Sequence, residues 1–119
     1  MAKDDYAVCV YKILKYLYEK LKRGEPVEEA FLAADSPFLG ISASYWAYII
    51  QSLLKEELIE GPALKAVWGI DVIILNLEKA RITPRGIEYL SENSTMRKAA
   101  GFLKGTVSAA ELIFSIGTA

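Results

Sequence analysis

Polar side chains between Ser42 and Lys55 are the part of this sequence best suited to contact another molecule. Serine and tyrosine hydroxyls bond phosphates, glutamine can bond adenine through two contacts, and lysine neutralises phosphate charge. Helical spacing places most of these side chains opposite an apolar side that begins at Trp46. They could therefore contact double-stranded DNA, and the alternative is a merely solvated helix face. The candidates are Ser42, Ser44, Tyr45, Tyr48, Gln51 and Lys55.

The charge distribution predicts that any such binding is weak. The chain has 14 Lys and Arg against 15 Asp and Glu, and residues 24–60 carry a net charge of −6. Residues 1–23 and 61–119 carry +3 and +2. Non-specific DNA affinity comes mainly from cations that displace counterions, so we expect weak and salt-sensitive binding. The cations expected to contact phosphate are Lys55, Lys65, Lys79, Arg81 and Arg85.

Enzymatic chemistry finds little support. The sequence has no His, which excludes the usual general base and the commonest zinc ligand. The one Cys, Cys9, falls beside an apolar pattern and is expected to be a packed thiol. The adjacent pairs Glu28-Glu29 and Glu56-Glu57 point in different directions on a helix and cannot jointly hold a metal. We expect a protein without catalytic residues, metal or cofactor.

The elements that position these residues follow from apolar periodicity and from turn residues. Helical spacing and capping residues predict five helices, and β-branched or aromatic runs predict a small antiparallel sheet between the third and fourth. The predicted helices are 5–22, 27–33, 43–57, 84–92 and a last helix capped by Thr95, and the strand runs are 58–61, 66–68 and 72–75.

Three helices followed by a β-ribbon are the plan of a winged helix-turn-helix. We therefore expect a mainly α (α+β) domain over residues 1–94, with a small antiparallel β-wing. Residues 95–119 form an extra C-terminal helix that packs on this domain or mediates dimerisation. The expected wing, 66–77, is apolar with the single charge Asp71, whereas a wing that lies along phosphates would normally be more basic.

The stretch Ile82-Thr83-Pro84-Arg85-Gly86-Ile87-Glu88-Tyr89-Leu90 looks like the strand-to-helix junction that closes a wing. Together with Ile41-Ser42, the segment from Leu53 to Ile59 and the segment from Ser91 to Thr95, it resembles the YjcQ-like family of small bacterial and prophage proteins. The similarity covers about residues 41–104. The resemblance implies a winged-helix fold, a bacterial or phage cytoplasm and no known catalytic residues.

The last predicted helix offers a second function. Small residues at helical spacing would let two helices of a homodimer approach closely, and apolar neighbours would add contact area. Packing of the same face against the first helix is the alternative, with slightly greater weight. The candidate dimer residues are Gly101, Phe102, Gly105, Ala109 and Leu112.

The expected location is the cytoplasm, without membrane insertion. The N-terminus is charged and runs directly into an amphipathic pattern, unlike a secretory signal. The uncharged stretch 36–54 contains Pro37 and Gly40, which argue against a membrane span. The competing functional hypothesis is a winged-helix scaffold for protein contacts, which the seven tyrosines favour mildly.

Overall fold

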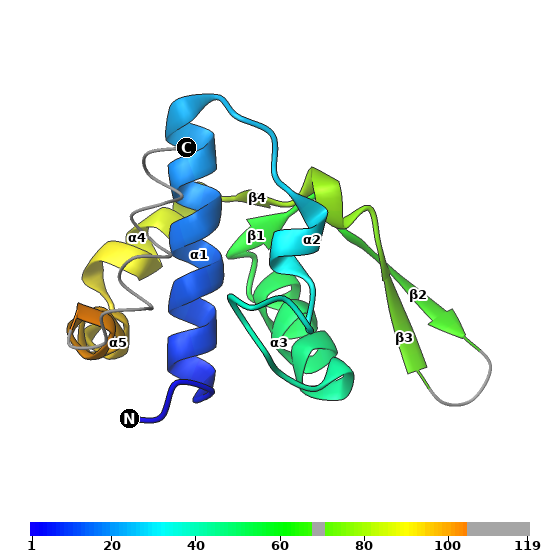
Figure 1. The fold of residues 1–119 in the computed structure, drawn as a ribbon. Coiled ribbons are helices and arrows are strands. Elements are labelled where there is room, and N and C mark those ends of the chain that lie inside the picture. Colours follow the sequence, from blue (N-terminus) through cyan, green and yellow to red (C-terminus); the bar gives the residue numbers. More distant parts are fainter. Residues whose placement is uncertain (68–70, 105–119) are drawn as a thin grey trace.

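The computed structural model describes residues 1–67 and 71–104 (Figure 1). Its order of three helices, a β-ribbon and two more helices is the predicted order, and the mainly helical class with a small antiparallel sheet is confirmed. The elements are α1 (Tyr6–Arg23), α2 (Glu29–Leu32), α3 (Ala43–Lys55), β1 (Ile59–Glu60), β2 (Ala63–Val67), β3 (Asp71–Leu75), the 3₁₀ turn η1 (Leu77–Lys79), β4 (Arg81–Ile82), α4 (Pro84–Glu92) and α5 (Ser94–Lys104).

Helix α1 is central, with α3, α4, α5 and β4 packed around it (Figure 1). Helical spacing puts Lys12 opposite the apolar residues of α1, where a side chain is expected to face solvent, and this expectation is wrong. Lys12 is buried, because the loop before α3 covers that side and the carbonyl oxygen of Phe38 accepts a hydrogen bond of 3.0 Å from its Nζ. Burial lowers the pKa of Lys12. Helix α1 is thus enclosed on more sides than its amphipathic pattern indicates.

Helix α3 has the predicted inward side. Ile49, Ile50 and Leu53 are buried, and the Nε1 of the half-buried Trp46 donates a hydrogen bond of 2.7 Å to the carbonyl oxygen of Leu32 in α2. The helix ends at Lys55 instead of the expected residue 57, because Glu57 adopts a left-handed conformation with φ of 60°.

The β-ribbon consists of two short antiparallel ladders. β1 pairs with β4, with Ile59 opposite Ile82, and β2 pairs with β3 from Ala63–Leu75 to Val67–Asp71. β4 is not among the three predicted strand runs but lies at the junction that the family resemblance implies. Gly61 separates the ladders: its φ is 110°, and a Cβ there would lie 2.0 Å from the carbonyl oxygen of Lys79. The β2–β3 hairpin projects from the helical body (Figure 1).

Helices α4 and α5 return along α1. α4 begins as predicted, with Thr83 Oγ1 accepting a hydrogen bond of 2.9 Å from the Gly86 amide. The cap of α5 is Asn93 instead of Thr95: its side-chain oxygen accepts from the amides of Thr95 at 2.9 Å and Met96 at 3.1 Å. Asparagine two residues earlier is an equally good cap, so residue type alone did not locate this boundary.

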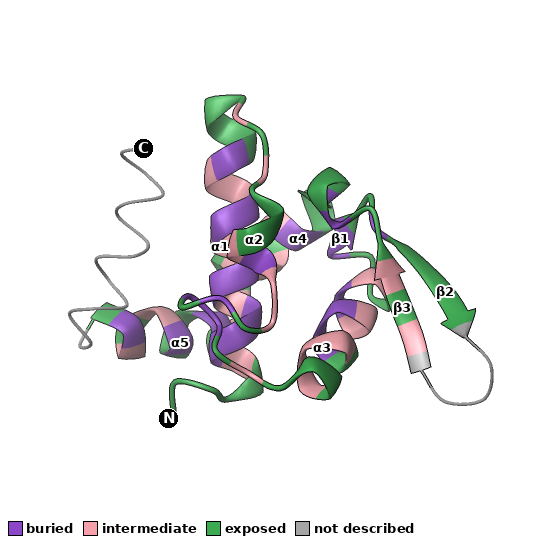
Figure 2. Ribbon diagram, turned by 45° about the vertical axis from the view of Figure 1, so that its right-hand side comes forward, coloured by how far each residue is buried: buried purple, intermediate pink, exposed green. Residues whose placement is uncertain are grey.

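The described part of α5 packs against α1. Ala99 and Leu103 are buried with Val8 in a small apolar cluster, and Figure 2 shows buried positions on the side of α5 that faces α1. Residues 94–104 of the last helix therefore have packing contacts within the chain. Residues 105–119 lie outside the described ranges.

Candidate nucleic-acid interface

One side of α3 remains open to solvent. Ser44 and Lys55 are exposed, the side chain of Tyr48 is 63% exposed and Gln51 is half-buried. We refer to these four residues as the outward stripe of α3. The helix contains no Asp or Glu between Ala43 and Lys55, although the surrounding segment is acidic. The outward stripe thus presents hydroxyl and amide groups and one ammonium group, without a carboxylate within the helix.

The N-terminal end of α3 is tied to the rest of the protein. Ser42 is the predicted N-cap, and its Oγ accepts a hydrogen bond of 3.3 Å from the Tyr45 amide. The Tyr45 hydroxyl donates a hydrogen bond of 2.8 Å to the carbonyl oxygen of Asp4, just before α1. Burial raises the pKa of Tyr45. Both side chains therefore have structural partners, and we do not include them in the outward stripe.

Tyr48 lies at the middle of the outward stripe and is held from one side. Its ring meets the ring of Tyr6 edge-on, with centroids 6.2 Å apart. Its carbonyl oxygen accepts a hydrogen bond of 2.8 Å from the Ser52 hydroxyl, an ordinary contact one helical turn away. The position of the Tyr48 ring is thus fixed while most of its surface stays accessible.

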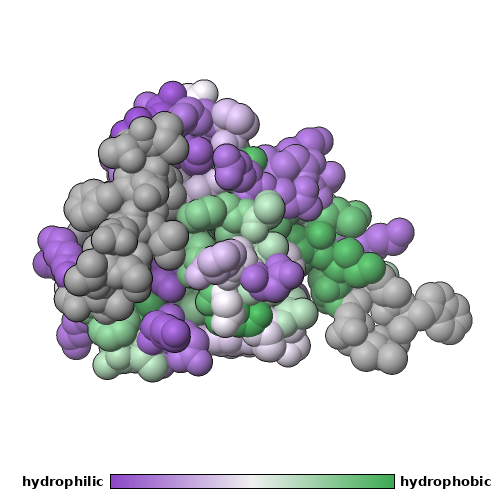
Figure 3. All heavy atoms as spheres, in the orientation of Figure 1, coloured by the Kyte–Doolittle hydropathy of each residue, from purple (hydrophilic) through white to green (hydrophobic). Residues whose placement is uncertain are grey.

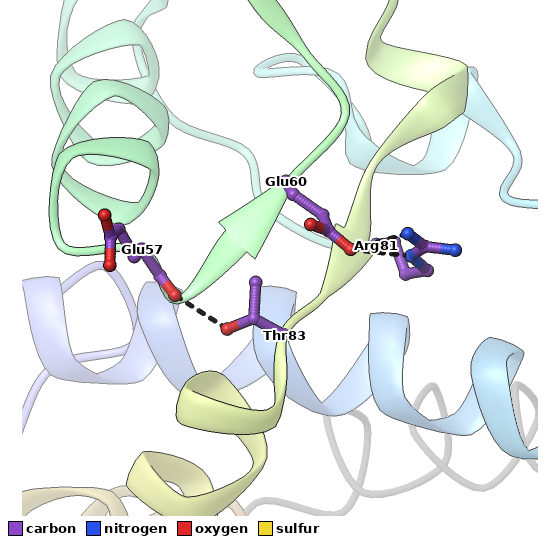
Figure 4. Close-up of polar contacts among 4 residues, drawn as sticks. All are labelled: Glu57, Glu60, Arg81 and Thr83. Carbon is purple, nitrogen blue, oxygen red and sulfur yellow. Dashed lines mark hydrogen bonds and ion pairs between the residues drawn. The ribbon is translucent and has the colours of Figure 1, made fainter.

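The five cations expected to contact phosphate lie on five different elements. Lys55 belongs to the outward stripe and Lys65 is exposed on β2. Arg81 forms an exposed ion pair with Glu60 on the neighbouring strand, with Nε and Nη2 at 2.9 and 2.6 Å from Oε1 (Figure 4). Arg81 and Lys79 line a cavity of about 440 Å³ at the other end of the ribbon. Arg85 lines a different cleft.

That cleft, of about 580 Å³, lies between α1, the end of α3 and α4. Arg85 shares this cleft with three carboxylates. Burial, and to a smaller extent the nearby Tyr6 and Glu56, raises the pKa of Tyr89, which also lines the cleft. An anionic backbone would meet more negative than positive side chains there. The cleft therefore does not extend the outward stripe as a phosphate-binding surface.

The carboxylates that follow α3 are positioned by the junction at Thr83. Thr83 Oγ1 donates a hydrogen bond of 2.7 Å to the carbonyl oxygen of Glu57 (Figure 4). The Thr83 amide donates a hydrogen bond of 3.1 Å to the carbonyl oxygen of Leu58. These bonds connect the end of α3 with the start of α4. The exposed Glu56 and Glu57 consequently sit at the C-terminal end of the outward stripe, next to Lys55.

A groove that sequence reasoning missed runs along the other flank of the stripe. It has a volume of about 610 Å³ and lies between α3 and β3. Nothing in the sequence signals it, because α3 and β3 are separate along the chain and meet only in the folded structure. Its lining is uncharged throughout and consists of Ala43, Ser44, Trp46, Ala47, Val72, Ile73 and Ile74.

The predicted wing is apolar, as expected. The side chains of Leu64, Ile73 and Leu75 are 47%, 45% and 39% exposed. Figure 3 shows apolar side chains gathered over the β2–β3 hairpin. Lys65 is the only charged side chain described on this hairpin. The wing therefore presents apolar surface where a phosphate-binding wing would present cations.

Other candidate features have structural partners or lie elsewhere. Cys9 is fully buried, its Sγ lies 3.6 Å from the carbonyl oxygen of Asp4, and burial raises its pKa, which is the expected packed thiol. In residues 1–67 and 71–104 no cluster of side chains could hold a metal ion. Within the same ranges, no helix has the length and hydropathy needed to cross a bilayer.

The candidate dimer residues divide into two groups. Gly101 is exposed on α5 with open space beside it, and Phe102 is half-buried against the Val8 cluster. Gly105, Ala109 and Leu112 lie outside the described residues. The small-residue stripe can thus be followed only to its first position.

Comparison with known proteins identifies a family. The model of the family described as YjcQ protein matches residues 11–106, which include every described element except residues 6–10 of α1. No curated protein and no solved structure matches the chain.

Proposed function

The chain belongs to the YjcQ family, and we propose that it is a small non-enzymatic winged-helix protein that binds double-stranded DNA as a transcriptional regulator of bacterial or prophage type. The observation that carries this proposal is the outward stripe of α3, which is accessible, polar and free of carboxylates. It belongs to the helix that directly precedes the β-ribbon, where a winged helix carries its recognition helix.

The architecture supports insertion of α3 into a major groove. A helix with its side chains matches the width of that groove, about 12 Å, and the opposite side of α3 is anchored by Ile49, Ile50 and Leu53 in the core. Gln51 would contact a base edge, and Ser44 and Tyr48 would donate to phosphates or bases. Lys55 would supply charge at the C-terminal end of the stripe.

Charge limits the strength of this binding. Of the five predicted cations, Lys55 lies on the stripe and Lys65 is exposed on the hairpin that follows, whereas Arg81 is paired with Glu60. With about two phosphate contacts, a fourfold increase in salt should lower the affinity about twelvefold. Strong binding in the absence of other partners is not expected.

The proposal is tested by fluorescence anisotropy with labelled duplex DNA at low and moderate salt. Lys55→Ala should weaken binding and reduce the salt dependence, because one phosphate contact is lost. Lys98→Ala is the matched control, since it removes the same charge from an exposed position on α5. Equal effects of the two variants, or affinity that does not change with salt, would refute the proposal.

A second candidate function is a winged-helix scaffold for protein contacts. It is favoured by the apolar wing, because Leu64 is exposed on one face of the hairpin and Ile73 and Leu75 on the other, and exposed apolar side chains that gather in this way are typical of a surface that another protein covers. Binding of this kind should be insensitive to salt and should survive Lys55→Ala. Sedimentation of the chain as a monomer, with no partner recovered from cell extract, would count against it.

A further inference from the structure

The β2–β3 hairpin is incomplete as a sheet. Within the described residues, β2 and β3 pair only with each other, and the other ladder, β1–β4, is separate. A two-stranded hairpin is marginally stable in water, whereas three or more strands with an apolar face are stable. The hairpin nevertheless exposes three large apolar side chains. These features indicate a surface that gains stability when further strands are added.

The strand that can accept a further strand is β2. β3 lies on the side of α3, with which it lines the apolar groove, and β2 lies on the outer side in both ribbon views (Figures 1 and 2). The outer edge of β2 therefore presents unpaired backbone groups among the described residues. Natural edge strands are usually guarded by charges or prolines, and here the only guards are Lys65 and Pro62.

We propose that a second copy of this chain pairs antiparallel with the outer edge of β2, giving a continuous four-stranded sheet about a two-fold axis. An identical strand fits because β2 is almost uncharged and needs no opposite charge across from it. In an antiparallel pair centred on Leu64, Leu64 faces its own copy, and Lys65 faces Ala63 of the second copy. A pair centred on Lys65 is disfavoured, because two like charges would face each other.

The Leu64-centred register also accounts for the exposure of Leu64. The two Leu64 side chains, each 47% exposed in one chain, would contact each other on one face of the sheet. Ile74, opposite Leu64 in the hairpin, would extend this face on either side. The proposed pairing uses β2 and none of the residues of the outward stripe of α3, so the proposal does not depend on DNA binding.

Replacing Leu64 by charged residues tests the two-fold axis of the proposed dimer in solution. The native chain should sediment as a dimer at micromolar to millimolar concentration. Leu64→Asp and Leu64→Lys should each be monomeric, because the two-fold axis places like charges opposite each other, and an equimolar mixture should recover the dimer. This recovery also shows that both variants are folded. A native monomer throughout this range, or two variants that remain dimeric alone, would overturn the proposal.

Disulfide formation tests the register. Leu64→Cys should cross-link rapidly to its own copy under mild oxidation, because cross-strand partners have Cβ atoms about 4.5–5.5 Å apart. Ala63→Cys should cross-link slowly with itself but rapidly when mixed with Lys65→Cys. The native chain is the control for the buried Cys9, and Lys98→Cys is the control for random collisions. Cross-linking of Leu64→Cys no faster than that of Lys98→Cys would contradict the register and the edge pairing.

Discussion

Two helical glycines should respond in opposite directions to the same substitution. Gly86 lies in the first turns of α4 and Gly101 in the middle of α5. Alanine favours a helix by about 1 kcal/mol over glycine, so propensity alone predicts that both variants are stabilised. The difference lies in the space beside each Cα. A Cβ at Gly86 would lie 2.2 Å from the carbonyl oxygen of Leu58, whereas a Cβ at Gly101 has no neighbour within 4 Å.

The magnitude at Gly86 follows from what surrounds it. A carbon atom normally stays about 3.3 Å or more from a carbonyl oxygen, so α4 would have to shift by roughly 1 Å. The Leu58 carbonyl cannot yield easily, because it accepts the 3.1 Å hydrogen bond from the Thr83 amide. Overpacking of this kind costs about 1–3 kcal/mol, and here the cost falls at the upper end because backbone meets backbone. After the helix gain is subtracted, Gly86→Ala should destabilise the protein by about 2 kcal/mol.

Thermal and urea unfolding followed by circular dichroism measure both variants. At roughly 4 °C per kcal/mol for a chain of this size, Gly86→Ala should lower Tm by about 8 °C and Gly101→Ala should raise it by about 2–4 °C. An increase in Tm for Gly86→Ala would show that α4 does not approach the Leu58 carbonyl this closely. A large decrease for Gly101→Ala would show that its side of α5 is covered.

Three further outcomes follow from individual contacts. Trp46→Phe should cost about 1–2 kcal/mol in urea unfolding, because the Leu32 carbonyl loses the indole hydrogen bond, and an unchanged midpoint would contradict that bond. Burial raises the pKa of Tyr16 above its ordinary value of 10.0. The folded protein therefore keeps the Tyr16 proton at a pH at which the unfolded chain loses it, and the free energy of unfolding falls as the pH rises above 10.0. In Tyr16→Phe the free energy of unfolding should therefore fall less steeply with alkaline pH, and a fall as steep as that of the native chain would refute this role of Tyr16. Arg81→Ala should cost at most about 1 kcal/mol, because its ion pair with Glu60 is exposed, and a larger loss in thermal unfolding would show that the ribbon depends on this pair.

Much of the fold could be predicted from local sequence signals. Apolar periodicity located α1 and α3, and the caps Ser42 and Thr83 set the starts of α3 and α4, since capping depends on residues only three positions apart. The apolar character of the wing was also visible, because it is a matter of composition. The inward position of Trp46 followed from helical spacing alone.

The features that escaped prediction depend on contacts between distant segments. Lys12 is buried because the backbone of Phe38, in a loop 26 residues later, covers it. The pairing of β1 with β4 brings Glu60 to Arg81 across the whole hairpin. In the candidate site, the groove forms because β3 lies beside α3, and the five predicted cations are separated because they lie on five different elements. No local pattern encodes how these elements are arranged.

The most direct test of the DNA-binding proposal is a titration of isotope-labelled protein with a short random duplex at low salt, followed by amide chemical shifts. We expect the largest changes along α3 from Ser44 to Lys55, smaller changes near Lys65, and their disappearance when salt is added. Unchanged shifts along α3, or changes confined to the cleft around Arg85 and Tyr89, would contradict the proposal that α3 is the DNA-binding helix.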